Sequence, residues 1–157
     1  MSAPQLAQKV DFLKMLDKLV DALQLSTKDE ANVIFMELLK NDVHISKLEL
    51  CLKFIDINNG NDGVSNPLLF ACCQKKFELV KFLVENGADV NKLSSNGTNS
   101  IMYSFQKADF ETMIYLFQMG ATLTTKEKEI GTFPPDAKSI TQLVELFLSN
   151  QPKKTSE

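Results

Sequence analysis

The stretch "NPLLFACCQKKFELVKFLVENGADVN", residues 66–91, contains two helix-like segments and ends in a glycine turn. Asn66 is a favourable N-cap, and Pro67 is a favourable first helical residue. In the second segment the apolar residues share one side of a helix. Gly87 then supplies the left-handed conformation that ends many helices. The stretch therefore predicts a helix, a turn, a second helix and a hairpin loop.

A 33-residue period extends this pattern to both sides. The matching pairs are Gly87 with Gly120, Glu78 with Glu111, and "DVN" at 89–91 with "DIN" at 56–58. Residues 142–151 repeat the pattern of residues 78–87 at a shift of 64, two short of two periods. A single unit of this kind cannot bury its own apolar faces, so we expect several units to stack into one core.

These residues resemble the ankyrin-repeat family, whose consensus reads "TPLHxAAxxGHxEVVKLLLExGADVN". The matching positions here are Pro67-Leu68, Ala71, Glu78, Val80-Lys81, Leu83 and Gly87-Ala88-Asp89-Val90-Asn91, and in the next unit Gly97, Glu111 and Gly120-Ala121. Asn66 and Leu69 stand where the consensus has its first Thr and its His. The resemblance covers roughly residues 33–151. It implies an all-α ankyrin-repeat solenoid of about four helix-turn-helix units, with short β-hairpin loops and an N-terminal helical cap.

The resemblance also implies a single domain over residues 1–150. Its expected parts are an N-terminal helical cap or degenerate first unit (1–32), a divergent repeat (33–58), the best-matching repeat (61–91), a further repeat (94–124), a C-terminal capping repeat (131–151) and a disordered tail (152–157). The apolar spacing over residues 5–25 predicts a long helix. Ser26 begins "STKDE", which resembles a capping box and predicts a second helix to about Lys40.

Composition excludes several classes of function. The chain has 157 residues, of which 44% are apolar and 24% charged, and a net charge of −3 with its cations spread along the sequence. It therefore lacks the basic patch that nucleic-acid binding needs. No apolar run reaches the roughly 20 residues of a membrane span, and the start has no signal-peptide core. Three unpaired cysteines favour a reducing, cytoplasmic location, with the nucleus or a host cell as open alternatives.

The adjacent Cys72 and Cys73 could be read as a reactive or metal-binding pair. A nucleophilic thiol needs a neighbouring base or positive field, and a zinc site usually needs four ligands. His44 is the only histidine, and its "NDVHIS" context predicts a turn or cap. Cys72 falls on a small core position of the repeat, and Cys73 on a groove position. We therefore expect no enzyme, no metal and no cofactor.

The resemblance implies that a protein partner docks on the hairpin tips and the first-helix face. The corresponding residues are Asp62, Ser65, Cys73, Gln74, Ser95, Asn96, Thr98, Gln106, Lys107 and Lys126. Phe77 and Phe110 share one position at the start of the second helix and are both expected in the core.

The function expected is a non-catalytic protein–protein interaction module. Two alternatives stay open: an inhibitor or regulator of an enzyme such as a kinase, and a pathogen or parasite effector that mimics host ankyrin proteins. A monomer is expected, with a homodimer through the N-terminal helix as the alternative.

Overall fold

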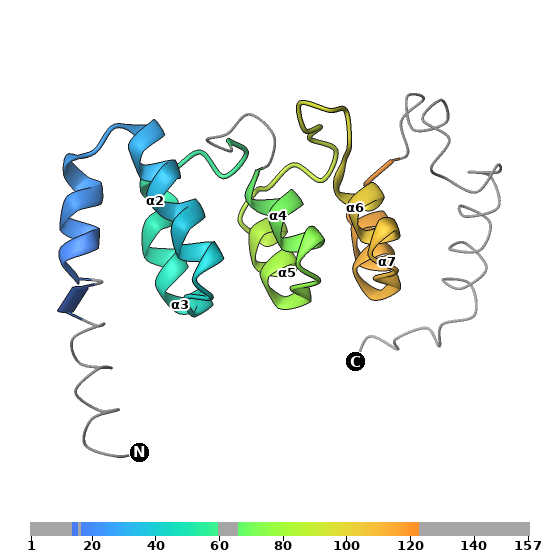
Figure 1. The fold of residues 1–157 in the computed structure, drawn as a ribbon, viewed down its shortest axis with the longest axis horizontal. Helices are drawn as coiled ribbons and strands as arrows, with labels where there is room; N and C mark the ends of the chain where they lie inside the picture. The colour runs from blue at the N-terminus through green and yellow to red at the C-terminus, as the bar shows by residue number, and fades with distance from the viewer. Residues whose placement is uncertain (1–13, 16, 60–65, 123–157) are drawn as a thin grey trace, which may run out of the picture.

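The computed structural model describes residues 14–15, 17–59 and 66–122, and its helices form pairs that stand in a row (Figure 1). The elements are a helix over residues 17–25, then α2 (Lys28–Lys40), α3 (Ile45–Leu48), the 3-10 helix η1 (Glu49–Phe54), α4 (Pro67–Cys73), α5 (Phe77–Glu85), α6 (Ser100–Gln106) and α7 (Phe110–Gln118). We call α2/α3–η1 the first pair, α4/α5 the second and α6/α7 the third. The described parts of the loops between pairs lie along one edge, the upper edge in Figure 1. Within these described ranges the regular structure is all helical.

Two asparagines one period apart begin the first helices of the second and third pairs. Asn66 Oδ1 accepts from the Leu69 backbone N–H at 3.0 Å, and Asn99 Oδ1 accepts from Met102 N–H at 3.1 Å. Each bond satisfies a backbone donor that a helix start leaves unpaired. The predicted cap at Asn66 is confirmed, and Asn99 repeats it.

The helix α2 begins one residue later than predicted. Thr27, not Ser26, is its N-cap, because Glu30 lies three residues further on, as a capping box requires. The Thr27 N–H donates to Glu30 Oε2 at 2.9 Å, and Thr27 Oγ1 accepts from Glu30 N–H at 3.4 Å. The backbone hydrogen bond from Thr27 lowers the pKa of Glu30. Ser26 Oγ instead donates to the Ala22 carbonyl at 2.8 Å.

A left-handed residue closes the turn between the two helices of every pair. Asp42, Lys75 and Ala108 have φ values of 54°, 55° and 52°, and they lie 33 residues apart. Side chains make this conformation costly, by roughly 1–2 kcal/mol relative to glycine. The repeat geometry therefore imposes the turn on Lys75 and Ala108, which do not favour it, and on Asp42, whose residue type tolerates it better.

Residues 88–99 link the second pair to the third. The Ser94 N–H donates to the Thr98 carbonyl and the Gly97 N–H donates to the Ser94 carbonyl, both at 2.9 Å. Gly97 has φ 81°, which glycine adopts at low cost. The loop reverses direction as predicted. The two hydrogen bonds hold this reversal, and residues 88–99 form no β-strand.

Asn91 joins this loop to the end of the third pair. Its Nδ2 donates to the Gly120 carbonyl at 3.1 Å, and its Oδ1 accepts from the Thr122 N–H at 2.8 Å. One side chain thus pairs a donor and an acceptor of the backbone that follows α7. Gly120 has φ 87°, a left-handed conformation that turns the chain. This turn brings the Thr122 N–H within reach of Asn91.

Asn58, one period earlier, makes the same two bonds. Its Nδ2 donates to the Gly87 carbonyl at 3.3 Å, and its Oδ1 accepts from the Asp89 N–H at 2.7 Å. We call Asn58 and Asn91 the asparagine rungs. They fix the position of each loop relative to the next one along the stack.

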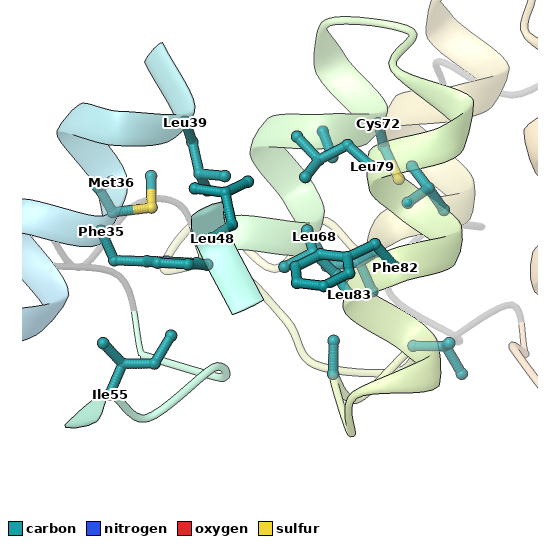
Figure 2. Packing of buried hydrophobic residues seen from close by; sticks show 14 of the residues in the cluster. Phe35, Met36, Leu39, Leu48, Ile55, Leu68, Cys72, Leu79, Phe82 and Leu83 are labelled. Atoms are coloured by element: carbon teal, nitrogen blue, oxygen red, sulfur yellow. The ribbon is translucent and has the colours of Figure 1, made fainter. Parts of the chain in front are cut away.

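A continuous apolar core runs through all three pairs. Its buried members extend from Leu23, in the helix over residues 17–25, to Ala121 after α7. Figure 2 shows part of this core, with Phe35, Met36, Leu39, Leu48 and Ile55 from the first pair and its loop, and Leu68, Cys72, Leu79, Phe82 and Leu83 from the second. Burying one such side chain stabilises the fold by about 1.5–3 kcal/mol. The helix over residues 17–25 adds Leu23 to the same core.

Part of the predicted domain organisation lies outside the described residues. This applies to the start of the long N-terminal helix, to the C-terminal capping repeat at 131–151 and to the tail at 152–157. These assignments remain predictions.

Replacing Ala108 by glycine is expected to stabilise the protein by about 0.5–1 kcal/mol, because glycine relieves the left-handed strain. Thermal unfolding followed by circular dichroism should show a rise of about 2 °C. The control is Ala22→Gly, at an exposed helical position, which should destabilise. An Ala108→Gly protein that melts below the parent would contradict the turn assignment.

Asn91→Ala is expected to destabilise the protein by about 1–2 kcal/mol, because the paired backbone groups after α7 lose their partner. Urea unfolding of both proteins measures the difference. Asn59→Ala serves as the matched control, since Asn59 is exposed next to a rung, and it should change stability by less than about 0.5 kcal/mol. Equal effects of the two substitutions would refute the role of the rungs.

Candidate functional site

The first helices of the second and third pairs present the same strip of side chains. On α4 the less buried positions are Phe70, Cys73 and Gln74, spaced i, i+3 and i+4. This spacing places them on one face of the helix. The opposite side of α4 is fully packed, because Ala71 and Cys72 have no exposed surface.

Helix α6 repeats the arrangement one period later with Tyr103, Gln106 and Lys107. Helices α4 and α6 pack directly against each other, so the two sets are continuous. We call these six residues the first-helix strip: Phe70, Cys73, Gln74, Tyr103, Gln106 and Lys107. Gln74, Gln106 and Lys107 are exposed, whereas the other three are half-buried. The structure thus brings together the four predicted site residues of the first helices.

Phe70 and Tyr103 were not among the residues predicted from the sequence. These two aromatic residues lie 33 positions apart, and each precedes a predicted site residue, Cys73 or Gln106, by three. The helical spacing was therefore a sufficient signal. Half-buried aromatic side chains combine a fixed orientation with apolar contact area, which is typical of residues that dominate binding energy.

The predicted loop residues stand at the tip between the second and third pairs. Ser95 and Asn96 are exposed, and Thr98 is half-buried. Asn96 Oδ1 accepts from the Thr98 N–H at 3.2 Å and also from the Ser94 hydroxyl. Ser94 itself is buried, and its Oγ accepts from the Thr98 N–H at 3.0 Å. These bonds give the tip a defined backbone shape and hold the exposed Asn96 side chain in place before any partner binds.

Three predicted site residues, Asp62, Ser65 and Lys126, lie outside the described residues. Their role in binding stays a prediction.

The prediction for Phe110 is wrong, and the one for Phe77 holds in part. Phe110 is 63% exposed at the start of α7. Phe77, one period earlier, is half-buried and meets Tyr115 edge-on, with ring centroids 5.7 Å apart. Phe77 and Phe110 occupy the same position of the repeat but have different neighbours. Tyr115, which contacts Phe77, lies on α7 in the next pair.

The three cysteines differ in access. Cys51 and Cys72 are buried, and Cys73 is half-exposed within the first-helix strip. Burial raises the pKa of the Cys72 thiol to about 12, far above the range in which a thiolate forms at neutral pH. Cys72 is therefore a packing residue, as predicted, and Cys73 is the thiol of the described chain that solvent reaches.

His44 lies in a cap, as its sequence context predicted. Its Nδ1 accepts from the Ser46 backbone N–H at 3.3 Å at the start of α3. Across the described ranges, no group of three or more His, Cys, Asp or Glu residues is placed to hold a metal ion. In the same part of the chain, no helix has the length and apolar character to cross a membrane.

Comparison with known proteins agrees with the helix pairs. The family model for ankyrin repeats, in three copies, matches residues 21–127. The chain belongs to the ankyrin-repeat family. Ankyrin repeats generally mediate protein–protein interaction, and the family is a class of non-enzymatic interaction modules. The matched range contains all three pairs and the first-helix strip.

Individual ankyrin proteins match over a shorter range. Ankyrin repeat protein OPG189 of vaccinia virus (strain Copenhagen) is 32% identical over 68 residues, and the proteins of the same name in monkeypox virus and variola virus are 34% and 32% identical over the same length. Each match covers 43% of this chain and 12% of the relative. The chain thus matches about one eighth of the length of these curated relatives.

Iodoacetamide is expected to label the folded protein at Cys73 first, because Cys51 and Cys72 are buried. Mass spectrometry should find one label in the folded chain and three in urea, one for each cysteine. Cys73→Ser should remove the label from the folded protein while leaving two in urea. Labelling of Cys72 at the same rate as Cys73 in the folded chain would contradict the assigned burial.

Proposed function

We propose that this ankyrin protein is a non-catalytic binding module whose first-helix strip and loop tip dock one protein partner. The observation that carries the proposal is the repetition of the strip at the 33-residue period on two helices in direct contact. The strip combines two half-buried aromatic rings with exposed amide and ammonium groups. That mixture suits a protein surface better than an apolar small molecule.

Internal hydrogen bonds of the proposed docking surface support a rigid mode of binding. The loop tip is closed by its own hydrogen bonds, and the asparagine rungs hold successive loops together. A surface that is ordered before binding loses little conformational entropy when a partner docks. An interface of standard size, about 800 Å² on each side, would extend over the strip and the adjoining tip.

A second candidate is an effector that acts on a host protein through the same surface. The observation that favours it is the poxvirus origin of the matched relatives. Regulation of an enzyme such as a kinase, a cytoplasmic location, and the choice between a monomer and a homodimer stay predictions.

Gln106→Arg is expected to weaken partner binding by about tenfold or more, because a longer charged side chain replaces an exposed amide of the strip. Gln74→Arg and Asn96→Arg should weaken binding of the same partner. Affinity purification with quantitative mass spectrometry identifies the partner, and isothermal titration with the purified partner measures the change in Kd.

The matched control is Gln118→Arg, the same substitution at an exposed position on α7, a second helix. It should leave binding unchanged. Loss of the partner in the control but not in the strip variants would place the interface on the second helices and overturn the proposal.

A further inference from the structure

The charges of the second and third pairs are divided unevenly between their helices. The first helices with their turns, residues 66–76 and 99–109, carry three lysines and one acidic residue. The second helices with their C-caps, residues 77–86 and 110–119, carry one lysine and three glutamates. The whole chain has a net charge of −3. The helices that bear the first-helix strip are therefore positive within a chain that is negative as a whole.

Two of the four charged residues beside the strip are bonded within the protein. The Lys76 ammonium group pairs with the Asp42 carboxylate of the first pair and lies 3.4 Å from the Leu39 carbonyl. The Asp109 carboxylate caps α7, because it accepts from the Thr112 N–H at 3.3 Å and from the Thr112 hydroxyl at 2.6 Å. Lys76 and Asp109 are thus already satisfied.

The other two charged residues are Lys75 and Lys107. Both are exposed, and neither forms an ion pair within the part of the chain that the structure describes. Lys75 follows Gln74 in the turn after α4, and Lys107 is the C-cap of α6. Gln74 and Lys107 occupy the same position of the repeat on two helices in contact. The two lysines therefore stand at the same end of the strip, with their charge available to a partner.

The first pair does not extend this positive end. Glu37 and Lys40, one period before Phe70 and Cys73, form an ion pair at 2.7 Å. The uncompensated positive charge beside the strip is thus limited to α4 and α6, the helices that also carry its two aromatic rings.

The kind of cation narrows the complementary group. All 17 basic residues of the chain are lysines, so no arginine is present. Phosphorylated residues are commonly recognised by clusters of arginine, whose planar group bonds to two oxygens at once. A lysine ammonium group is a point charge without that geometry. We therefore take the complementary group to be a carboxylate.

The aromatic and charged parts of the strip lie about one helical turn apart. Tyr103 and Lys107 are separated by four residues, which is about 6 Å along a helix. In an extended chain, residues i and i+2 point to the same side and lie about 6.6–6.8 Å apart. An apolar residue and an acidic residue two positions away can therefore contact both parts of the strip at once.

On the basis of the proposed function, we propose that the partner of the first-helix strip presents an acidic segment. An apolar side chain of that segment lies against Phe70 and Tyr103, and its carboxylates pair with Lys75 and Lys107. The rings supply contact area. The lysines select the partner by charge, since electrostatic complementarity acts on specificity and association rate more than on affinity.

The probe is the peptide acetyl-Glu-Ser-Phe-Ser-Glu-amide, titrated into the full ¹⁵N-labelled chain at low salt. The expected result is saturable shifts of the amide signals of residues 70–76 and 103–108, with a Kd of about 1–10 mM. Acetyl-Gln-Ser-Phe-Ser-Gln-amide should bind about fivefold more weakly, because it lacks the two exposed ion pairs. Raising NaCl from about 20 mM to about 500 mM should remove this preference, since salt screens exposed charges.

The double variant Lys75→Gln/Lys107→Gln should bind both peptides equally. The matched control is Lys18→Gln/Lys53→Gln, which makes the same change in net charge at two exposed lysines outside the second and third pairs. It should keep the fivefold preference. Tyr103→Ser should weaken both peptides to the same extent. Circular dichroism checks that each variant is folded.

Four results would overturn the proposal. The first two are no saturable shifts with the acidic peptide and equal Kd values of the two peptides in the parent. The third is a preference that survives in Lys75→Gln/Lys107→Gln, which would leave the lysines a role only at the C-terminal ends of their helices. The fourth is inorganic phosphate that shifts the same amides at a lower Kd than the acidic peptide, which would assign the lysines to a phosphorylated partner.

Failure of the proposed function would look different: Gln106→Arg would leave the protein partner bound, whatever the peptides do. That substitution acts through the bulk that it adds to the strip. The lysine variants remove charge with little change in size, so contact and charge are tested separately. A partner lost in Gln106→Arg, together with equal binding of the two peptides, would keep the docking surface and reject only its preference for acidic segments.

Discussion

The asparagine rungs are the constraint on which the described stack depends. Asn58 and Asn91 each pair a backbone donor and acceptor of the following unit, at the same offsets and one period apart. Burial of apolar side chains holds the helices together, but the hydrophobic effect is non-directional and does not fix their relative orientation. Hydrogen bonds have defined geometry, so the rungs set where each pair stands relative to the next. The strip on α4 and α6 is continuous because that offset is constant.

The two edges of the stack differ as a consequence. At the loop edge the rungs and the bonds around Ser94 order the backbone, and the loop tip stands beside the strip. At the opposite edge each turn contains a strained left-handed residue, and packing depends on the residue that begins each second helix. Phe77 lies edge-on against Tyr115 between the second and third pairs, whereas an apolar groove lies between the first and second pairs. One repeat thus yields a polar surface at one edge and an apolar groove at the other.

Sequence alone predicted most of the local structure. The Asn66 cap, the glycine turn at Gly87 and the small core position of Cys72 depend on residue type and spacing, which a sequence shows directly. The exposure of Phe110 was mispredicted because the repeat position alone does not specify which side chains surround it. The four-residue α3 and its continuation as η1 were also not foreseen, since the first pair departs from the consensus. Phe70 and Tyr103 were within reach of the same periodic argument that found Cys73.

Native-state hydrogen exchange at the two rung-bonded amides, Asp89 and Thr122, tests the central claim most directly. If the rungs fix the offset between pairs, these amides exchange only through openings that also expose α5 or α7, and their protection matches that of the helices. Exchange of both amides at unprotected rates, while α5 and α7 stay protected, would contradict the account. The loops would then follow the helices without positioning them.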